Sequence, residues 1–128
     1  EHLPNLQDHL ARFSNALSPG GCLVIAVPNH ESADSKHYGE SWAALDVPLH
    51  LYHFKRSNIA DLAKQHELVL EEVRNIPFDS FYVSMLSENI KFGKGNLPRA
   101  FWSGLTSNLK GGGRKNMSSL IYILRKPK

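Results

Sequence analysis

The sequence has one cysteine, Cys22, and no apolar run of the roughly 18 residues that a membrane-spanning helix needs. A single thiol cannot form an internal disulfide, so the chain suits a reducing compartment. The first residues also lack the basic and then hydrophobic regions of a signal peptide. These absences predict a soluble, cytoplasmic protein with no membrane partner. Cys22 begins an apolar stretch, and we expect it to be a buried structural thiol.

Acidic residues are missing from the C-terminal part of the chain. Residues 89–128 carry nine Lys and Arg and no Asp or Glu, whereas residues 1–88 carry all twelve acids and six basic residues. Clustered cations attract phosphates on a substrate, a nucleic acid or a lipid surface. The simpler interpretation places Lys91, Lys94, Lys110, Arg114 and Lys115 on solvated loops. The aromatic residues near these cations form no interleaved stacking motif, which weakens the case for nucleic-acid binding. A module that binds nucleic acid or another polyanion is therefore the alternative function and not the main one.

Two glycine-rich segments lack the patterns of nucleotide-binding loops. Residues 110–116 place three glycines beside lysines, but their spacing is not that of a P-loop. Residues 93–98 lack the final glycine of the dinucleotide fingerprint and follow no predicted strand. The sequence therefore offers no phosphate cradle of either known kind.

The segment 17–29 gives the clearest structural signal. Pro19, Gly20 and Gly21 are typical of a helix end and a tight turn, and residues 22–27 form a continuous apolar run. Such a run is typical of a strand that helices cover on both faces. The helical spacing of apolar residues over 4–17 predicts an amphipathic helix before the turn.

The rest of the chain alternates between helical and strand patterns. We expect a long loop, a helix capped by Ser57 and ending near His66, a strand near a sheet edge, two further helices and a last strand, over 30–48, 57–66, 68–76, 78–89, 97–109 and 118–124. The length and a hydrophobic content of 41% suit one domain over 1–128. The sequence predicts a single α/β domain.

His50 and His53 are the candidate catalytic residues. Two histidines three residues apart face one site on a helix, but Pro48 and the aromatic run after it favour extended backbone, which would point them to opposite faces. We therefore expect no metal site. A single neutral histidine suffices as a general base, so either residue is a candidate for removing a proton from a hydroxyl or amine acceptor. The alternative is that both are hydrogen-bonded structural histidines that orient the loop.

Three stretches of the sequence carry a family resemblance. Residues 1–5, 17–21 and 23–29 together resemble the region that follows the fourth strand of class I S-adenosylmethionine-dependent methyltransferases. The later motifs over 38–42, 45–48 and 50–54 are similar to a bacterial branch of that family. The resemblance implies that the chain is the C-terminal half of a Rossmann-like methyltransferase domain. Its three strands would be strands five to seven of the family sheet, with the last strand antiparallel between the other two.

The resemblance also implies roles for individual residues. The family's glycine-rich loop and acidic cofactor contacts precede the position that matches Glu1, so only Glu1, His2 and Leu3 match positions beside S-adenosylmethionine. Asn29 lies at the C-terminal end of the predicted strand, where open α/β sheets place ligands, so we expect it to bind the substrate. Trp42 and Tyr52 would form walls of the acceptor pocket.

The resemblance limits the activity and the partners that we expect. It implies methyl transfer to a small-molecule acceptor, with the fragment inactive by itself. Without a fourth strand, the edge of 22–27 is unpaired and would favour self-association.

Overall fold

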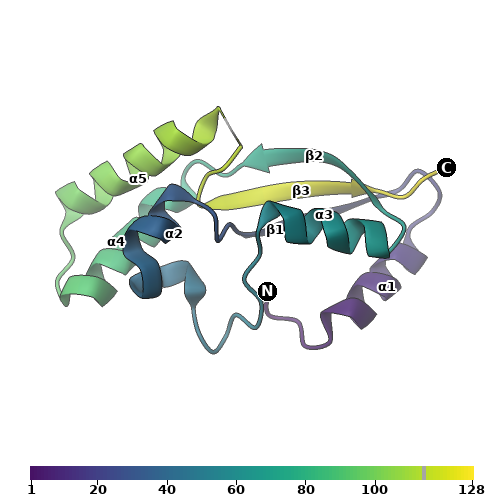
Figure 1. The fold of residues 1–128 in the computed structure, drawn as a ribbon, viewed down its shortest axis with the longest axis horizontal. Helices are drawn as coiled ribbons and strands as arrows, with labels where there is room; N and C mark the ends of the chain where they lie inside the picture. Colours follow the sequence, from purple (N-terminus) through teal and green to yellow (C-terminus); the bar gives the residue numbers. More distant parts are fainter. Residues whose placement is uncertain (114) are drawn as a thin grey trace.

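The computed structural model describes residues 1–113 and 115–128. Its elements are α1 (Leu6–Ala16), β1 (Cys22–Pro28), α2 (Ala33–Tyr38), the short 3₁₀ helices η1 (Gly39–Ser41) and η2 (Ala43–Leu45), α3 (Arg56–Gln65), β2 (Val69–Asn75), α4 (Asp79–Phe92), α5 (Leu97–Gly112) and β3 (Ser119–Arg125). Figure 1 shows an elongated molecule, with the sheet, α1 and α3 at one end and α2, α4 and α5 at the other. None of the described helices is long and apolar enough to cross a membrane.

The sheet has three strands in the order β1-β3-β2. β3 runs antiparallel to both neighbours, and Tyr122 in its middle pairs with Ile25 on one side and Val73 on the other. This arrangement confirms the prediction that the last strand lies antiparallel between the other two. The predicted α/β class with flanking helices is also confirmed.

The main core lies between one face of the sheet and the helices α1 and α3. Leu120, Tyr122 and Leu124 on β3 are each at most 1% exposed, and Ile59 from α3 and Leu10 from α1 are 2% and 4% exposed. Burial of one such aliphatic side chain contributes about 1.5–3 kcal/mol. The alternation of side chains along β3 therefore fixes which face of the sheet the helices cover.

The opposite face of the sheet is open in the described part of the chain. Val24 on β1 is 57% exposed, Val69 on β2 is 56% exposed, and the thiol of Cys22 is exposed. The predictions of a strand covered on both faces and of a buried thiol are therefore wrong. The apolar run of β1 places β-branched residues on both faces, so composition alone does not tell how many faces are covered.

The connections contain more helix than the sequence predicts. The expected long loop holds α2, which Ser32 caps by accepting a hydrogen bond from Ser35 N, followed by η1 and η2. The predicted cap at Ser57 is wrong, because α3 begins at Arg56 and Lys55 is its N-cap. The side chain of Asn58 accepts a hydrogen bond from Lys55 N at 2.9 Å, which sets the start of that helix two residues earlier.

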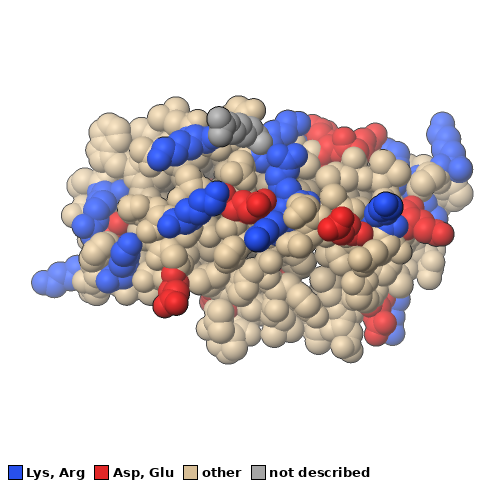
Figure 2. Space-filling view, viewed as in Figure 1, with Lys and Arg blue, Asp and Glu red and all other residues tan. Residues whose placement is uncertain are grey.

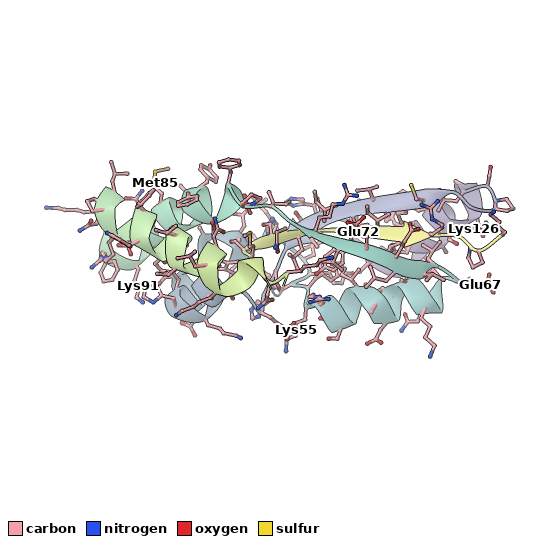
Figure 3. The ribbon with its side chains drawn as sticks, turned by 90° about the horizontal axis from the view of Figure 1, so that it is seen from above. Lys55, Glu67, Glu72, Met85, Lys91 and Lys126 are labelled. Carbon is pink, nitrogen blue, oxygen red and sulfur yellow. The ribbon has the colours of Figure 1, made fainter. Side chains whose placement is uncertain are left out.

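The helices α4 and α5 form a hairpin at the far end of the molecule. α4 ends at Gly93, whose positive φ of 67° suits glycine, and Asn96 caps α5. A side chain at Gly104 would lie 2.8 Å from Phe81, so glycine permits the close approach of the two helices. Figure 3 places Met85 and Lys91 at this end and Glu67 and Lys126 at the opposite one.

The basic C-terminal region is partly neutralised by the fold. Arg99 pairs with the buried carboxylate of Glu88, and Arg125 pairs with Glu71. On the face shown in Figure 2, positive side chains gather over the end formed by α4 and α5, while elsewhere they alternate with acidic ones. Arg114, which was expected on a solvated loop, lies outside the described residues.

Candidate active site

The candidate site begins in the loop that follows η2. Asp46 ends η2 in the left-handed region, and its carbonyl accepts a hydrogen bond from His50 N at 2.9 Å. Asp residues are enriched among non-glycine residues with positive φ, so this turn suits the sequence. The turn folds residues 47–50 back toward the end of η2.

The two candidate histidines both bond to carbonyl groups of η2. His50 Nδ1 lies 2.9 Å from Ala44 O, and His53 Nε2 lies 2.8 Å from Leu45 O. Carbonyl groups at the end of a short helix lack helical partners, so ring N–H donors satisfy them. The ring centroids are 6.5 Å apart. The prediction that the rings point to opposite faces is wrong, because residues 50–53 form no regular strand.

The first two residues lie beside this loop. Leu51 N donates to Glu1 O at 2.8 Å, and His2 Nδ1 lies 3.1 Å from Leu49 O. Figure 1 shows the N-terminus between the two ends of the molecule, next to the segment that leads into α3. Backbone pairing therefore brings Glu1 and His2 to His50, although the sequence separates them widely.

The side chains of Glu1, His2 and His50 converge on one point. Glu1 Oε1 lies 3.7 Å from His2 Nε2 and 3.8 Å from His50 Nε2, and Asp46 Oδ2 lies 3.9 Å from His50 Nε2. The side chains of His50 and Glu1 are 10% and 18% exposed, whereas that of His2 is 59% exposed. The cluster is thus enclosed on the protein side and open on the side of His2.

A row of rings connects the cluster to the end of β1. The centroids of His2 and His50 are 4.6 Å apart, and those of His53 and His30 are 5.9 Å apart. His30 follows Asn29, which forms a parallel bridge with Phe54 at the carboxyl end of β1. Ligands of open α/β sheets bind outside the carboxyl ends of strands. The row of rings runs from this end of β1 to the cluster.

Two of the predicted substrate-binding residues are buried. Asn29 is fully buried, and its Nδ2 donates to Asn116 and to Met117 O. Trp42 is 2% exposed, and its indole N–H donates to Asp34 at 2.9 Å. Both side chains are therefore bonded to protein partners behind the loop that carries His50.

The predicted residues Tyr52 and Leu3 lie nearer to the surface. The ring of Tyr52 stacks on Phe54, with centroids 6.1 Å apart, and lines a groove together with His53. Leu3 and Glu1 line a separate apolar cavity of about 90 Å³ that reaches between α1, α3 and the sheet. Glu1 is the one charged residue among those that line this cavity.

The sequence did not indicate that the rings of His2 and His50 lie in contact, or that the carboxylate of Asp46 lies near His50. The pairing depends on the backbone hydrogen bond from Leu51 N to Glu1 O and on the bond between the His2 ring and Leu49 O, and no local pattern encodes contacts over that distance. The turn at Asp46 left one local signal, an acidic residue four positions before a histidine.

Comparisons with known proteins address the fold. The chain is similar to a candidate sarcosine dimethylglycine methyltransferase from Galdieria sulphuraria, with a TM-score of 0.53 and 16% identity over 98% of this chain and 49% of the other. The chain has a methyltransferase-like fold. It is also similar to phosphoethanolamine N-methyltransferase 2 from Haemonchus contortus, with a TM-score of 0.50 and 19% identity.

The structural similarity covers only part of each of the two other proteins. The second comparison covers 99% of this chain and 31% of the other, whose structure contains phosphomonomethylethanolamine and S-adenosylhomocysteine. This chain therefore spans half or less of the length of these proteins. No protein-family model and no curated protein matches the sequence.

The described residues do not form a complete cofactor site for a methyltransferase-like fold. The turns that lead from β1 to α2 and from β2 to α4, residues 29–32 and 76–78, contain no glycine. A strand-to-helix turn that approaches a nucleotide closely needs glycine at its tightest point. The residues described here do not fit the nucleotide part of S-adenosylmethionine, and Glu1, His2 and Leu3 stay the predicted contacts to its methionine end.

Proposed function

We propose that this chain forms the acceptor side of an S-adenosylmethionine-dependent methyltransferase and is inactive by itself. The observation that carries the proposal is the geometry of His50 on a methyltransferase-like fold. Its Nδ1 is held by Ala44 O, so its Nε2 is left facing the carboxylate of Glu1 at 3.8 Å. A histidine with one nitrogen fixed and the other directed at a ligand site is suited to orient or deprotonate an acceptor.

The proposed acceptor is a small molecule with a hydroxyl or amine group. Methyl transfer to oxygen or nitrogen depends mainly on positioning the acceptor and removing its proton. His50 would hold that proton at Nε2. Glu1 and Leu3 would stay beside the methionine end of S-adenosylmethionine, across from His50.

The remaining predicted residues take supporting places in this proposal. His53 donates through Nε2 to Leu45 O and is exposed, so we propose that it orients the loop or the acceptor. Tyr52 would form a wall of the site. Asn29 and Trp42 would hold the loop from behind, through their buried hydrogen bonds.

The test uses the protein in the full length that its gene encodes. Calorimetry with S-adenosylmethionine, with ATP as the control nucleotide, should give heat for the first ligand alone. Methyl transfer is then measured with radiolabelled cofactor on a panel of acceptors. The panel begins with sarcosine and phosphoethanolamine, because the names of the two structural neighbours contain them. No binding of S-adenosylmethionine by the full-length protein would contradict the proposal.

The alternative function is a basic module that binds nucleic acid or another polyanion without chemistry. The exposed positions of Lys94, Lys110 and Lys115 favour it, while the pairing of Arg99 and Arg125 with carboxylates reduces it. Salt-dependent retention on an oligonucleotide column tests this alternative. Elution at the salt concentration of a neutral control protein would exclude it.

Self-association through the edge of β1 stays a proposal. β1 is an end strand of the three-stranded sheet among the described residues, and its outer edge has no strand partner there. Unpaired edges recruit other strands. Sedimentation over a hundredfold range of protein concentration tests this, and a constant monomer mass would exclude it.

We also propose a cytoplasmic location for the protein, which cell fractionation tests.

A further inference from the structure

We infer that Glu1, His2 and His50 bind one divalent transition-metal ion, with the carboxylate of Asp46 nearby at 3.9 Å from His50 Nε2. The site shares Glu1, His2 and His50 with the proposed methyltransferase site, and the role of the ion rests on that proposed function. The three residues each place one donor atom so that all three lie within 4.8 Å of one another. They come from the N-terminal segment and from the turn after η2. One backbone hydrogen bond and the bond between the His2 ring and Leu49 O hold these two segments together.

The distances between the donors suit a shared ion. Glu1 Oε1 is 3.7 Å from His2 Nε2 and 3.8 Å from His50 Nε2. An ion at about 2.1 Å from each of two ligands in a tetrahedral site separates those ligands by about 3.4 Å. Small rotations of the side chains close the remaining difference, because the side chain of His2 is 59% exposed.

The hydrogen bonds of both rings prepare the histidines for metal binding. His50 Nδ1 faces Ala44 O at 2.9 Å and His2 Nδ1 faces Leu49 O at 3.1 Å. A carbonyl oxygen only accepts, so each Nδ1 carries the proton and each Nε2 presents its lone pair. A backbone carbonyl on the second ring nitrogen is the usual partner of a metal-binding histidine. Both lone pairs point to the same carboxylate.

The donor set selects the class of ion. Two imidazole nitrogens with one or two carboxylates bind Zn²⁺, Fe²⁺, Co²⁺ or Mn²⁺, whereas Ca²⁺ and Mg²⁺ prefer sites made of oxygen ligands. The carboxylates of Glu1 and Asp46 supply the negative charge that offsets a divalent cation. The exposed side of His2 leaves a coordination position for water or an acceptor atom.

The nearby His53 provides a matched control. Its ring lies 6.5 Å from that of His50, but its Nε2 is bonded to Leu45 O and it does not belong to the donor cluster.

In the proposed methyltransferase, a bound ion would polarise the acceptor and lower its pKa. Without the ion, His50 would take the proton directly, so metal dependence separates the two routes.

The test is a Co²⁺ titration of the tag-free full-length gene product, followed by visible absorption and by calorimetry. We expect one ion per chain, with d–d bands that Zn²⁺ removes and Mg²⁺ leaves unchanged. Glu1→Gln and His50→Gln should each weaken binding at least about a hundredfold, because ligand loss exceeds the effect of losing a supporting hydrogen bond. His53→Gln and His66→Gln should retain the affinity within about threefold.

Thermal unfolding without metal checks that each variant is folded, and Zn²⁺ should raise the Tm of the unsubstituted chain but not that of His50→Gln. Equal binding by the unsubstituted chain and His50→Gln, or loss of binding in His66→Gln, would overturn the inference. Neither readout uses S-adenosylmethionine or an acceptor. Failure of the metal site is thus distinct from failure of cofactor binding by the full-length protein.

Discussion

His50 Nε2 lies 3.8 Å from a carboxylate oxygen of Glu1, and the hydrogen bond from Leu51 N to Glu1 O holds the two segments in register. The site thus depends on a loop that other parts of the molecule must keep in place. Trp42 anchors this loop through Asp34, and the hydroxyl oxygen of Ser87 on α4 accepts a hydrogen bond from the backbone N–H of Ala43 at 2.8 Å. The stability of these anchors can be tested separately from activity.

Asp34→Ala should destabilise the protein by about 3 kcal/mol. The carboxylate of Asp34 is 1% exposed and accepts hydrogen bonds from Trp42 Nε1, Ser107 Oγ and Ser118 Oγ. Its removal leaves three buried donors without an acceptor, which is costly in a low-dielectric interior. Urea unfolding measures the loss, and Asp61→Ala on the exposed side of α3 is the control. Equal midpoints for the two variants would show that the network contributes nothing.

Arg99→Met should cost more stability than Arg125→Met. The two guanidinium side chains are 45% and 44% exposed, but Glu88, the partner of Arg99, is fully buried, whereas Glu71, the partner of Arg125, is 46% exposed. Loss of Arg99 leaves a buried carboxylate uncompensated and should cost about 2 kcal/mol, after allowance for its solvent exposure. Loss of Arg125 should cost less than about 1 kcal/mol.

Urea unfolding at neutral pH compares these two variants. Because the exposure of the cations is matched, the difference isolates the burial of the acidic partner. A larger loss for Arg125→Met would contradict the arrangement of the α4–α5 hairpin described above.

Tyr122→Phe should leave the protein equally stable or stabilise it by up to about 1 kcal/mol. The hydroxyl of Tyr122 is buried and has no hydrogen-bond partner among the described residues. Burial raises the pKa of Tyr122 to about 12. The folded protein therefore retains this proton more strongly than the unfolded chain, whose tyrosine pKa is about 10.

The difference in tyrosine pKa between the folded and unfolded states makes the free energy of unfolding depend on pH. This contribution is complete below about pH 10 and is lost as the pH rises from 10 toward 12. Thermal unfolding from pH 8 to 11.5 should show a steeper decline for the unsubstituted chain than for Tyr122→Phe. Tyr82→Phe, at a position that is 59% exposed, is the control and should follow the unsubstituted chain. Parallel profiles for all three proteins would be evidence against the buried, unpaired hydroxyl.

Cys22 should react with a thiol reagent in the native state nearly as fast as in the unfolded state. The structure places its thiol on the open face of the sheet, near the exposed Val24. Labelling with a disulfide reagent, with and without guanidinium chloride, measures the ratio of the two rates. A native rate slower by a factor of about 100 or more would mean that the thiol is protected, because protected groups react only through opening of the structure.

The strands and most helices were predictable because their signals are local. The Pro-Gly-Gly turn before β1 and the β-branched runs over 22–27 and 118–124 mark strands without reference to the rest of the chain. The exposure of Cys22 was not predictable in this way. An apolar strand has the same composition whether one or two of its faces are covered, and the cover comes from elements elsewhere in the sequence.

The candidate site was only partly predictable. His50, Glu1 and His2 were each selected, His50 from its chemistry and the other two from the family resemblance, but their convergence was not. The prediction of opposite faces for His50 and His53 assumed a regular strand, whereas the turn at Asp46 directs both rings to carbonyl groups of η2. Irregular backbone has no fixed period, so spacing does not determine which side chains meet.

The most direct test of the account is methyl transfer by the full-length gene product with radiolabelled S-adenosylmethionine and the acceptor panel described above. We predict transfer by the unsubstituted protein and by His66→Gln, and a loss of about 10²–10⁴-fold for His50→Gln, the range typical of a lost acid–base group. His50→Gln should still bind S-adenosylmethionine. Full activity in His50→Gln, or no binding of S-adenosylmethionine by the full-length protein, would contradict the account.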